Sequence, residues 1–176
     1  MFRTLCLLAV FTASSCMAGQ LVPGPQADFT ELVSIVRQLG LQASNDVELG
    51  SFRARREKAL CMLLPRLAAQ NWLGTVSKVG ANGDGKGILE ITLAEGVYVK
   101  TWNNFLSDAF DHTLIEPGTD VHNLLMTLQK GDAVIFSGHF LADDGGGCLR
   151  EASLTLSGKV TEPEFLFRFS SLRTDP

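Results

Sequence analysis

The sequence predicts a mainly β protein built on a small barrel of five to six strands, with a capping helix and an N-terminal helical pair. Residues 130–140 carry the clearest signal, because Lys130-Gly131 ends a helix and a β-branched and aromatic run follows. Three strand-like segments, beginning at Trp72, precede that helix, and two more follow the run. This order of strands and helix is that of an OB-like (oligonucleotide/oligosaccharide-binding) barrel.

Residues 1–18 are predicted to be an export signal peptide. Arg3 supplies a positive charge, residues 5–13 form an apolar core too short to anchor the chain across a bilayer, and small residues follow. Two processing points compete. Cleavage after Ala18 gives a soluble periplasmic protein, whereas lipidation of Cys16 gives a protein anchored to the envelope, and a lipid anchor would be its only attachment to a membrane.

The chain is acidic, with a formal net charge of −4. Arg3 is the only charged residue of the signal peptide, so its removal changes the charge to −5. A protein that binds nucleic acid through phosphate contacts usually has a basic surplus or a basic stripe. The acidic balance therefore disfavours nucleic acid as a partner.

Cys61 and Cys148 are the two cysteines beyond the signal peptide. In an oxidising compartment such a pair predicts a disulfide, with two buried thiols as the alternative. Cys148 lies in a polar, glycine-rich segment where a free thiol would be exposed, and this favours the disulfide. Neither cysteine has a His or Cys at ligand spacing beside it, so we expect no zinc site and no cofactor.

Residues 19–70 are predicted to be a helical extension that precedes the barrel domain, residues 71–176. Apolar residues recur at helical spacing in two stretches. The first helix is expected to have Asp28 as its N-cap and to end at Gly40, and the second to begin near Asn45 or Asp46.

The second helix carries the main basic cluster of the chain. The interpretation we favour is a solvated helix face with Glu57 interleaved, and an anion-binding or membrane-surface patch is the alternative. The cluster consists of Arg53, Arg55, Arg56 and Lys58.

Alternation of apolar and polar residues predicts the strands of the barrel. The expected strands cover residues 72–79, 88–93, 97–102, 134–140, 153–159 and 164–169. Between the third and fourth strands, a helix capped by Thr119 or Asp120 is expected to plug one end of the barrel.

Several segments of the sequence share features with one family. They are residues 72–76, 100–104, 106–108, 111–115, 131–138 and 163–169. Through them the sequence resembles bacterial exported proteins and predicted lipoproteins of the tRNA-anti-like OB-fold superfamily. The resemblance covers roughly residues 72–172. It implies an OB fold in the cell envelope and a nucleic-acid-binding role, and no catalytic residues come with it.

Tyr98, Lys100 and Trp102 are expected to share one face of the third strand. Two aromatic rings flanking a cation suit the stacking of a base or sugar ring while the ammonium contacts a phosphate or hydroxyl. The alternative is that the rings pack beneath a loop or the N-terminal helices. Asn103 and Asn104 follow directly and complete the predicted ligand-binding set.

The polar segment that follows contains Asp108, Asp111 and His112. Asp111 and His112 suggest acid–base chemistry, but side chains of adjacent residues usually diverge, and no nucleophile stands at a readable spacing. We therefore expect the protein not to be an enzyme. We expect the Asn and Asp side chains of residues 103–111 to hydrogen-bond the backbone of a long loop.

Together these features predict a non-enzymatic OB-like binding module of the cell envelope. Its expected ligand is an oligomer, single-stranded nucleic acid or saccharide, bound on the Tyr98, Lys100 and Trp102 face. The alternative is a protein-interaction or inhibitory module that masks an unidentified envelope protein through the same face or an exposed barrel edge.

Overall fold

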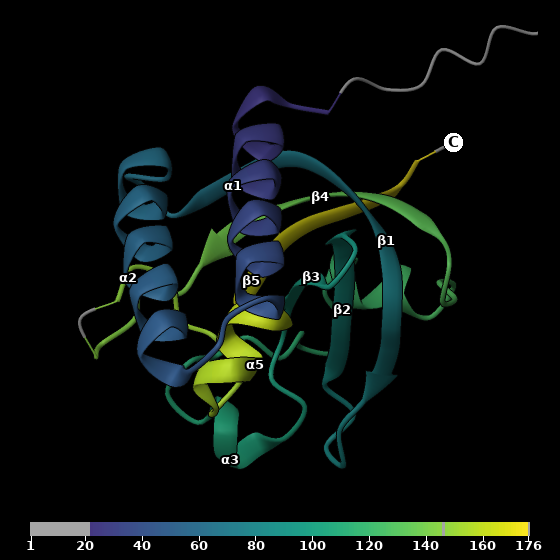
Figure 1. The fold of residues 1–176 in the computed structure, drawn as a ribbon. Coiled ribbons are helices and arrows are strands. Elements are labelled where there is room, and N and C mark those ends of the chain that lie inside the picture. The colour runs from purple at the N-terminus through teal and green to yellow at the C-terminus, as the bar shows by residue number, and fades with distance from the viewer. Residues whose placement is uncertain (1–21, 146, 176) are drawn as a thin grey trace, which may run out of the picture.

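Five strands form a closed barrel in the computed structural model, which describes residues 22–145 and 147–175 (Figure 1). They are β1 Ala68–Ala81, β2 Gly87–Ala94, β3 Val97–Lys100, β4 Ala133–Phe140 and β5 Glu164–Thr174. Their order around the barrel is β1-β2-β3-β5-β4, with β4 paired back to β1. Only the β3–β5 pairing is parallel among these strands. The predicted OB-like barrel is confirmed.

Aromatic side chains fill the interior of the barrel. Trp72, Phe136, Phe165 and Phe167 are fully buried, and the rings of Phe136 and Phe167 meet edge to face with centroids 5.4 Å apart. Buried aromatic side chains contribute large apolar areas and prefer this tilted geometry. The alternation of apolar and polar residues in the sequence therefore corresponds to side chains that alternately face the barrel interior and its outside, with the predicted core residues inside.

The predicted N-terminal helical pair is also confirmed. Helices α1 (Gly24–Leu41) and α2 (Asp46–Leu63) pack side by side against the barrel (Figure 1). Phe29 of α1 enters the core, and its ring centroid lies 5.2 Å from those of Trp72 and Phe165. Gln26 exchanges side-chain hydrogen bonds with the backbone N–H and C=O of Leu73 at 2.8 and 2.5 Å. These contacts join the first helix to β1.

Helix α4 (Asp120–Leu125) is the predicted plug between the third and fourth strands. Thr119 caps it, because its hydroxyl accepts a hydrogen bond from the N–H of His122 at 3.2 Å. Val121, Leu125 and the nearby Leu128 are buried in the barrel core. A short helix, α3 (Phe105–Asp108), lies earlier in the same connection.

The predicted strand over residues 153–159 is wrong. The chain there forms helix α5 (Leu156–Thr161), whose N-cap Thr155 accepts a hydrogen bond from Gly158 N–H at 3.0 Å. Val160 of α5 is fully buried in a cluster with Val36 of α1 and Leu49 of α2. Packing against the helical pair therefore outweighs the short alternating pattern, and the last predicted strand is β5.

The first helix begins earlier than predicted. Asp28 is not its N-cap, since α1 starts at Gly24 after Pro23. Proline is favoured in the first turn of a helix, where its missing N–H leaves no hydrogen bond unmade, and Pro25 occupies that turn. The boundary predicted at residue 71 falls within β1.

The predicted signal peptide, including Cys16 and the cleavage point after Ala18, lies outside the described residues. Within residues 22–145 and 147–175, no helix has the length and apolar character needed to cross a membrane.

Candidate functional site

Tyr98 and Lys100 lie on the outer side of β3, whereas the strand predicted to reach Trp102 ends at Lys100, so Trp102 lies in the segment that follows. Val97 and Val99 are fully buried, whereas the three predicted site residues are half-buried. All three side chains are therefore partly accessible to solvent. Whether these residues bind a ligand stays a prediction.

Lys100 stands between two carboxylates. Its Nζ lies 2.8 Å from Glu90 Oε2 of β2 and 2.8 Å from Glu164 Oε1 of β5. Burial opposes the charged form of Lys100, but hydrogen bonds to Glu164 and Glu90 outweigh it and raise its pKa above the ordinary value. The ammonium is thus already compensated, and a phosphate would have to replace a carboxylate to bind it.

Trp102 is tied to the connection that follows β3. Its indole Nε1–H donates to Asp111 Oδ2 at 2.7 Å, and its backbone N–H donates to Thr113 Oγ1 at 2.7 Å. These bonds set the orientation of the ring against the loop.

Asn103 and Asn104 are exposed at the start of that loop. Asn104 caps α3 by accepting a hydrogen bond from the N–H of Ser107 at 2.9 Å, and its amide donates to Asn103 Oδ1 at 2.7 Å. Buried Asp108 accepts from the N–H groups of Thr113 and Leu114 at 2.5 and 3.1 Å. The expectation that Asn and Asp bind loop backbone is confirmed for Asn104 and Asp108.

Asp111 connects three separate parts of the chain. Its buried carboxylate pairs with Arg150 and accepts from Trp102, and its backbone carbonyl accepts from Arg168 Nε at 2.7 Å. The adjacent His112 is exposed and has a left-handed backbone, with φ of 48°. The two side chains therefore lie in different environments, which suits a structural role for Asp111.

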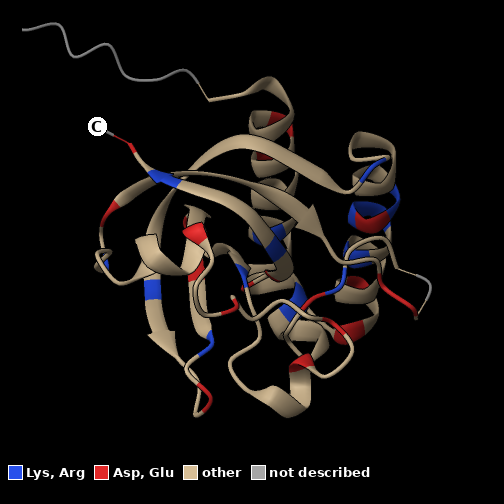
Figure 2. Cartoon of the chain, turned by 180° about the vertical axis from the view of Figure 1, so that it is seen from behind, with Lys and Arg blue, Asp and Glu red and all other residues tan. Residues whose placement is uncertain are grey.

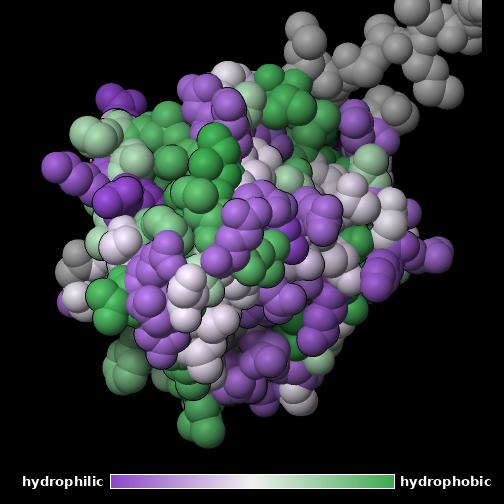
Figure 3. Space-filling view, viewed as in Figure 1, coloured by the Kyte–Doolittle hydropathy of each residue, from purple (hydrophilic) through white to green (hydrophobic). Residues whose placement is uncertain are grey.

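Three apolar residues of the same loop point into solvent, and the sequence analysis missed them. Phe105, Leu106 and Phe110 are 57, 85 and 91% exposed, and we call them the apolar tip. Apolar surface protrudes in Figure 3 at the lower end, where Figure 1 places α3. The available signal was three large apolar residues inside an Asn- and Asp-rich segment without strand or helix periodicity.

Two shallow cavities flank the loop. One, of about 340 Å³, lies between Phe110 and the segment after β4. The other, of about 390 Å³, lies between residues 112–121 and residues 168–170 of β5. Arg168 lines both cavities, and Phe110 is the residue of the apolar tip that borders one of them.

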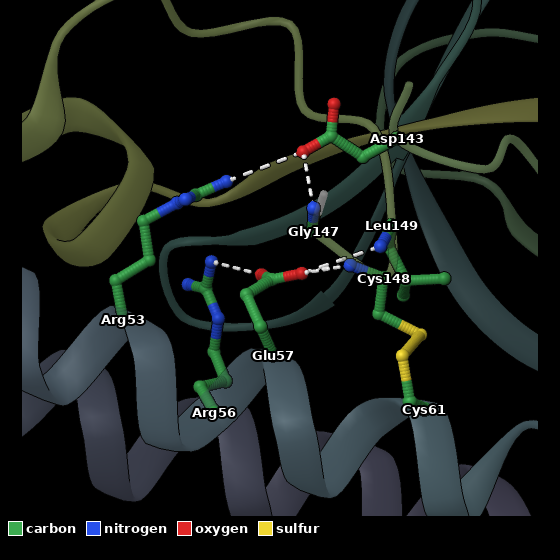
Figure 4. Close-up of a disulfide and its surroundings, with 8 residues drawn as sticks. All are labelled: Arg53, Arg56, Glu57, Cys61, Asp143, Gly147, Cys148 and Leu149. Carbon is green, nitrogen blue, oxygen red and sulfur yellow. Dashed lines mark hydrogen bonds and ion pairs between the residues drawn. A yellow bond between two sulfur atoms is a disulfide. The ribbon is translucent and has the colours of Figure 1, made fainter. Parts of the chain in front are cut away.

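A second cluster joins α2 to the segment after β4. Cys61 and Cys148 form the predicted disulfide, with Cα atoms 5.3 Å apart (Figure 4). Glu57 Oε2 accepts from the backbone N–H groups of Cys148 and Leu149 at 2.7 and 3.3 Å. The fully buried Arg56 pairs with Glu151 at 2.7 Å and Glu57 at 3.1 Å.

The interpretation of the basic cluster as a solvated face is therefore wrong for Arg56. The local sequence could not indicate this, because Glu151 lies far away in the chain. Elsewhere on the barrel strands, acidic and basic residues are interspersed rather than gathered into a basic stripe (Figure 2).

Comparison with known proteins gives no assignment, because no protein-family model and no curated protein matches the sequence significantly. In the described part of the chain, no group of three or more His, Cys, Asp or Glu side chains is placed to hold a metal ion.

Proposed function

We propose that this protein is a non-enzymatic binding module of the cell envelope whose ligand is another protein, contacted by the apolar tip. The observation that supports the proposal most is that the loop buries its acidic side chains and exposes its large apolar ones. Its Asp108 and Asp111 are buried and hydrogen-bonded, while Phe105, Leu106 and Phe110 are turned to solvent. Large apolar side chains grouped on a surface are typical of interaction sites.

The loop is held in place before any partner arrives. Contacts of Asp111 with Arg150, Trp102 and Arg168 attach it to the residues just after β3, to β5 and to the segment after β4. Binding by a preorganised segment loses less conformational entropy, so more of the apolar contact energy contributes to affinity. Exposed aromatic residues on such a segment are suited to act as anchors in a pocket of the partner.

Nucleic acid receives less support as a ligand. Lys100 is bound by two carboxylates, and the net charge is −4 over the whole chain. A phosphate would enter a wall whose nearest charges are Glu90 and Glu164. An apolar protein contact meets neither obstacle.

The envelope location is the second part of the proposal. It is supported by the predicted signal peptide and by the disulfide between Cys61 and Cys148, since disulfides persist in oxidising compartments.

The test compares capture by wild-type protein with capture by a Leu106→Ser/Phe110→Ser variant. Mature full-length protein is cross-linked in envelope extract, the captured protein is identified by mass spectrometry, and its affinity is then measured with purified components. We expect the variant to bind at least about tenfold more weakly, as loss of an anchor residue causes. Its melting temperature should not change, because both side chains are exposed.

Met62→Ser is the matched control, since Met62 is 70% exposed in the last turn of α2, away from the loop. This variant should bind like wild type. Equal affinity of the wild-type protein and the tip variant for the captured protein would refute the proposal. Affinity that collapses steeply with added salt would instead point to phosphate contacts.

A further inference from the structure

The two cysteines of the disulfide differ in their access to solvent. Cys61, in the last turn of α2, is exposed, whereas Cys148 is only 6% exposed. A cavity of about 330 Å³ is lined by both cysteines. A thiolate cleaves a disulfide by attacking one of its sulfur atoms, so the accessible sulfur decides where exchange can start. In the folded protein that sulfur belongs to Cys61.

Basic side chains line the same cavity. Arg53 and Lys58 lie on α2 together with Cys61, and both border the cavity. Nearby cations stabilise a thiolate. Glu57 also borders the cavity, but its carboxylate is already bound by Arg56 and by two backbone N–H groups. The charges around the cavity therefore favour the approach of a thiolate to the disulfide.

Cys148 ends a tight turn that we call the clasp, which comprises residues 143–145, 147 and 148. Within it, Asp143 N–H donates to the carbonyl of Cys148 at 3.3 Å, and the Asp143 carboxylate accepts from Gly147 N–H at 3.2 Å. Glu57 and Arg53 of α2 also contact the clasp, through the hydrogen bond to Cys148 N–H and an ion pair with Asp143 at 3.8 Å (Figure 4). The disulfide is the covalent attachment of the clasp to α2.

The clasp also contacts the loop that carries the apolar tip. Asp144 of the clasp and Asp111 of the loop both pair with Arg150. The cavity beside Phe110 is lined by Asp144 and Arg150. Movement of the clasp therefore changes one wall of this cavity and one of the two carboxylates that hold Arg150.

The base of this segment is fastened independently of the disulfide. Leu141 N–H donates to the carbonyl of Leu166 of β5 at 3.2 Å, and Leu166 N–H donates to the carbonyl of Arg150 at 2.9 Å. Arg56 of α2 pairs with Glu151 at 2.7 Å. Opening of the disulfide therefore frees the clasp and leaves the barrel and its contact with α2 in place.

We propose that the disulfide is a thiol-exchange site that regulates the apolar tip. A reductant with two neighbouring thiols attacks Cys61, the clasp is released from α2, and the protein then binds its partner more weakly. The weaker binding follows because a less ordered loop loses more conformational entropy when it binds. The inference rests on the proposed function, since the affinity that it regulates is that of the apolar tip.

The exchange proceeds in two steps. The first thiolate of the reductant forms a bond to Cys61 Sγ, the bond between Cys61 and Cys148 breaks, and Cys148 leaves as a thiolate that takes up a proton. The second thiol of the reductant then attacks the mixed disulfide and releases Cys61 as a thiol. Two electrons pass from the dithiol to the protein, and the reductant is left as a disulfide. An oxidant of the reverse reaction restores the clasp.

The first test measures how the disulfide is reduced. Oxidised mature full-length protein is treated with dithiothreitol, samples are alkylated at intervals, and the reduced fraction is measured by mass spectrometry. We expect a rate that is proportional to the dithiothreitol concentration and independent of urea below the unfolding transition, because Cys61 is attacked in the native state. A rate that rises steeply with urea in that range would show that unfolding must come first, and would overturn the inference.

The second test identifies the attacked sulfur and its entry point. Thioredoxin whose resolving cysteine is replaced by serine should form a mixed disulfide with Cys61, whereas one with Cys148 would overturn the inference. Lys58→Glu should slow reduction by dithiothreitol at least about twofold at low salt. Arg55→Glu is the matched control, since Arg55 is exposed on the same helix and does not line the cavity. Equal rates for the two variants would overturn the cavity as the entry point.

The third test compares the oxidised and the reduced protein. Reduction should speed hydrogen exchange at the amides of Asp111 and Thr113, which are hydrogen-bonded within the loop. It should also weaken binding of the captured partner protein at least about fivefold, and reoxidation should restore both. Cys61→Ala/Cys148→Ala should behave like the reduced protein with or without dithiothreitol. If this variant does not fold, the reduced wild type decides alone.

Unchanged hydrogen exchange and unchanged affinity after reduction would overturn the regulation. The exchange and trapping measurements need no partner, so they test the disulfide even if Leu106→Ser/Phe110→Ser refutes the proposed function. Loss of binding in that variant, together with equal affinities of oxidised and reduced protein, would instead keep the apolar tip and reject its regulation.

Discussion

Arg56 lies in an environment that is unusual for an arginine side chain. A guanidinium is normally exposed, yet Arg56 is 0% exposed and lies 5.4 Å from the centroid of the Phe165 ring. It is tolerated because Glu151, Glu57 and the carbonyl of Lys159 accept its hydrogen bonds. A buried charge needs such partners, since unpaired it costs several kcal/mol.

Replacing Arg56 with Leu should lower the free energy of unfolding by about 3–5 kcal/mol, because Glu151 would stay buried without its main partner. Urea denaturation measures the change. The double variant Arg56→Leu/Glu151→Leu should recover part of the loss, because Glu151 is then no longer buried without its partner, while Glu57 keeps its hydrogen bonds from the N–H groups of Cys148 and Leu149. Lys58→Leu, at an exposed position of the same helix, should change stability by less than about 0.5 kcal/mol. A loss below about 1 kcal/mol for Arg56→Leu would contradict the buried pair.

At the scale of elements, α2 is fastened to the segment after β4 by two kinds of bond. The disulfide joins Cys61 to Cys148 across 87 residues of sequence, and Glu57 binds the backbone of Cys148 and Leu149. These contacts hold a long, glycine-rich connection against a rigid helix. They also keep Glu151 beside Arg56.

Removal of the disulfide by Cys61→Ala/Cys148→Ala should cost about 4–5 kcal/mol of unfolding free energy in the chain-entropy model, since the closed loop is long. Thermal and urea unfolding of the variant and the oxidised wild type check this value. The double substitution leaves no thiol that could re-form the bond. Thiol titration of the denatured, unreduced wild type should find neither cysteine reactive, and two reactive thiols would contradict the bridge.

At the scale of the whole molecule, one polar row crosses the barrel wall. Ser77 of β1 donates to Glu90 of β2 at 2.9 Å, and Lys100 of β3 joins Glu90 to Glu164 of β5. Burial raises the pKa of Glu90, but its bonds to Lys100 outweigh burial and leave the pKa below the ordinary value. Side chains from four strands therefore form one hydrogen-bonded row, and its contribution to stability depends on the protonation of Glu90.

A lowered folded-state pKa means that Glu90 adds stability above its unfolded pKa of 4.5, and that this stability disappears as pH falls through the folded value. Urea denaturation from about pH 6 to about pH 3 should show the decline. Lys100→Met should flatten it, because Glu90 then loses the partner that lowers its pKa. An equally steep decline in this variant would assign the acid sensitivity to other carboxylates.

The contribution of Glu151 to stability changes with pH in the opposite direction to that of Glu90. Burial raises its pKa, so its contribution is complete below the unfolded value and is lost as pH rises through the folded value. The comparison of wild type with Lys100→Met separates the two, because Lys100 contacts Glu90 and not Glu151.

Local sequence patterns sufficed for much of this protein. Alternation at Val97 and Val99 placed β3 and its outer face, Asn45 and Thr119 marked helix starts, and Cys61 and Cys148 were recognised as a pair. Periodicity and capping depend on residues a few positions apart, so a single sequence carries them. Successive side chains of a strand point to opposite faces, so which residues face the barrel interior can also be predicted from neighbouring positions.

Contacts between distant residues set the rest. Val160 is buried against α1 and α2, which makes its segment a helix, and Arg56 is buried because Glu151 faces it from 95 residues away. Glu164 compensates Lys100 across 64 residues, while no described segment covers Phe110. Barrel closure and helix docking bring these partners together or leave them apart. A short-range pattern contains no information about that choice.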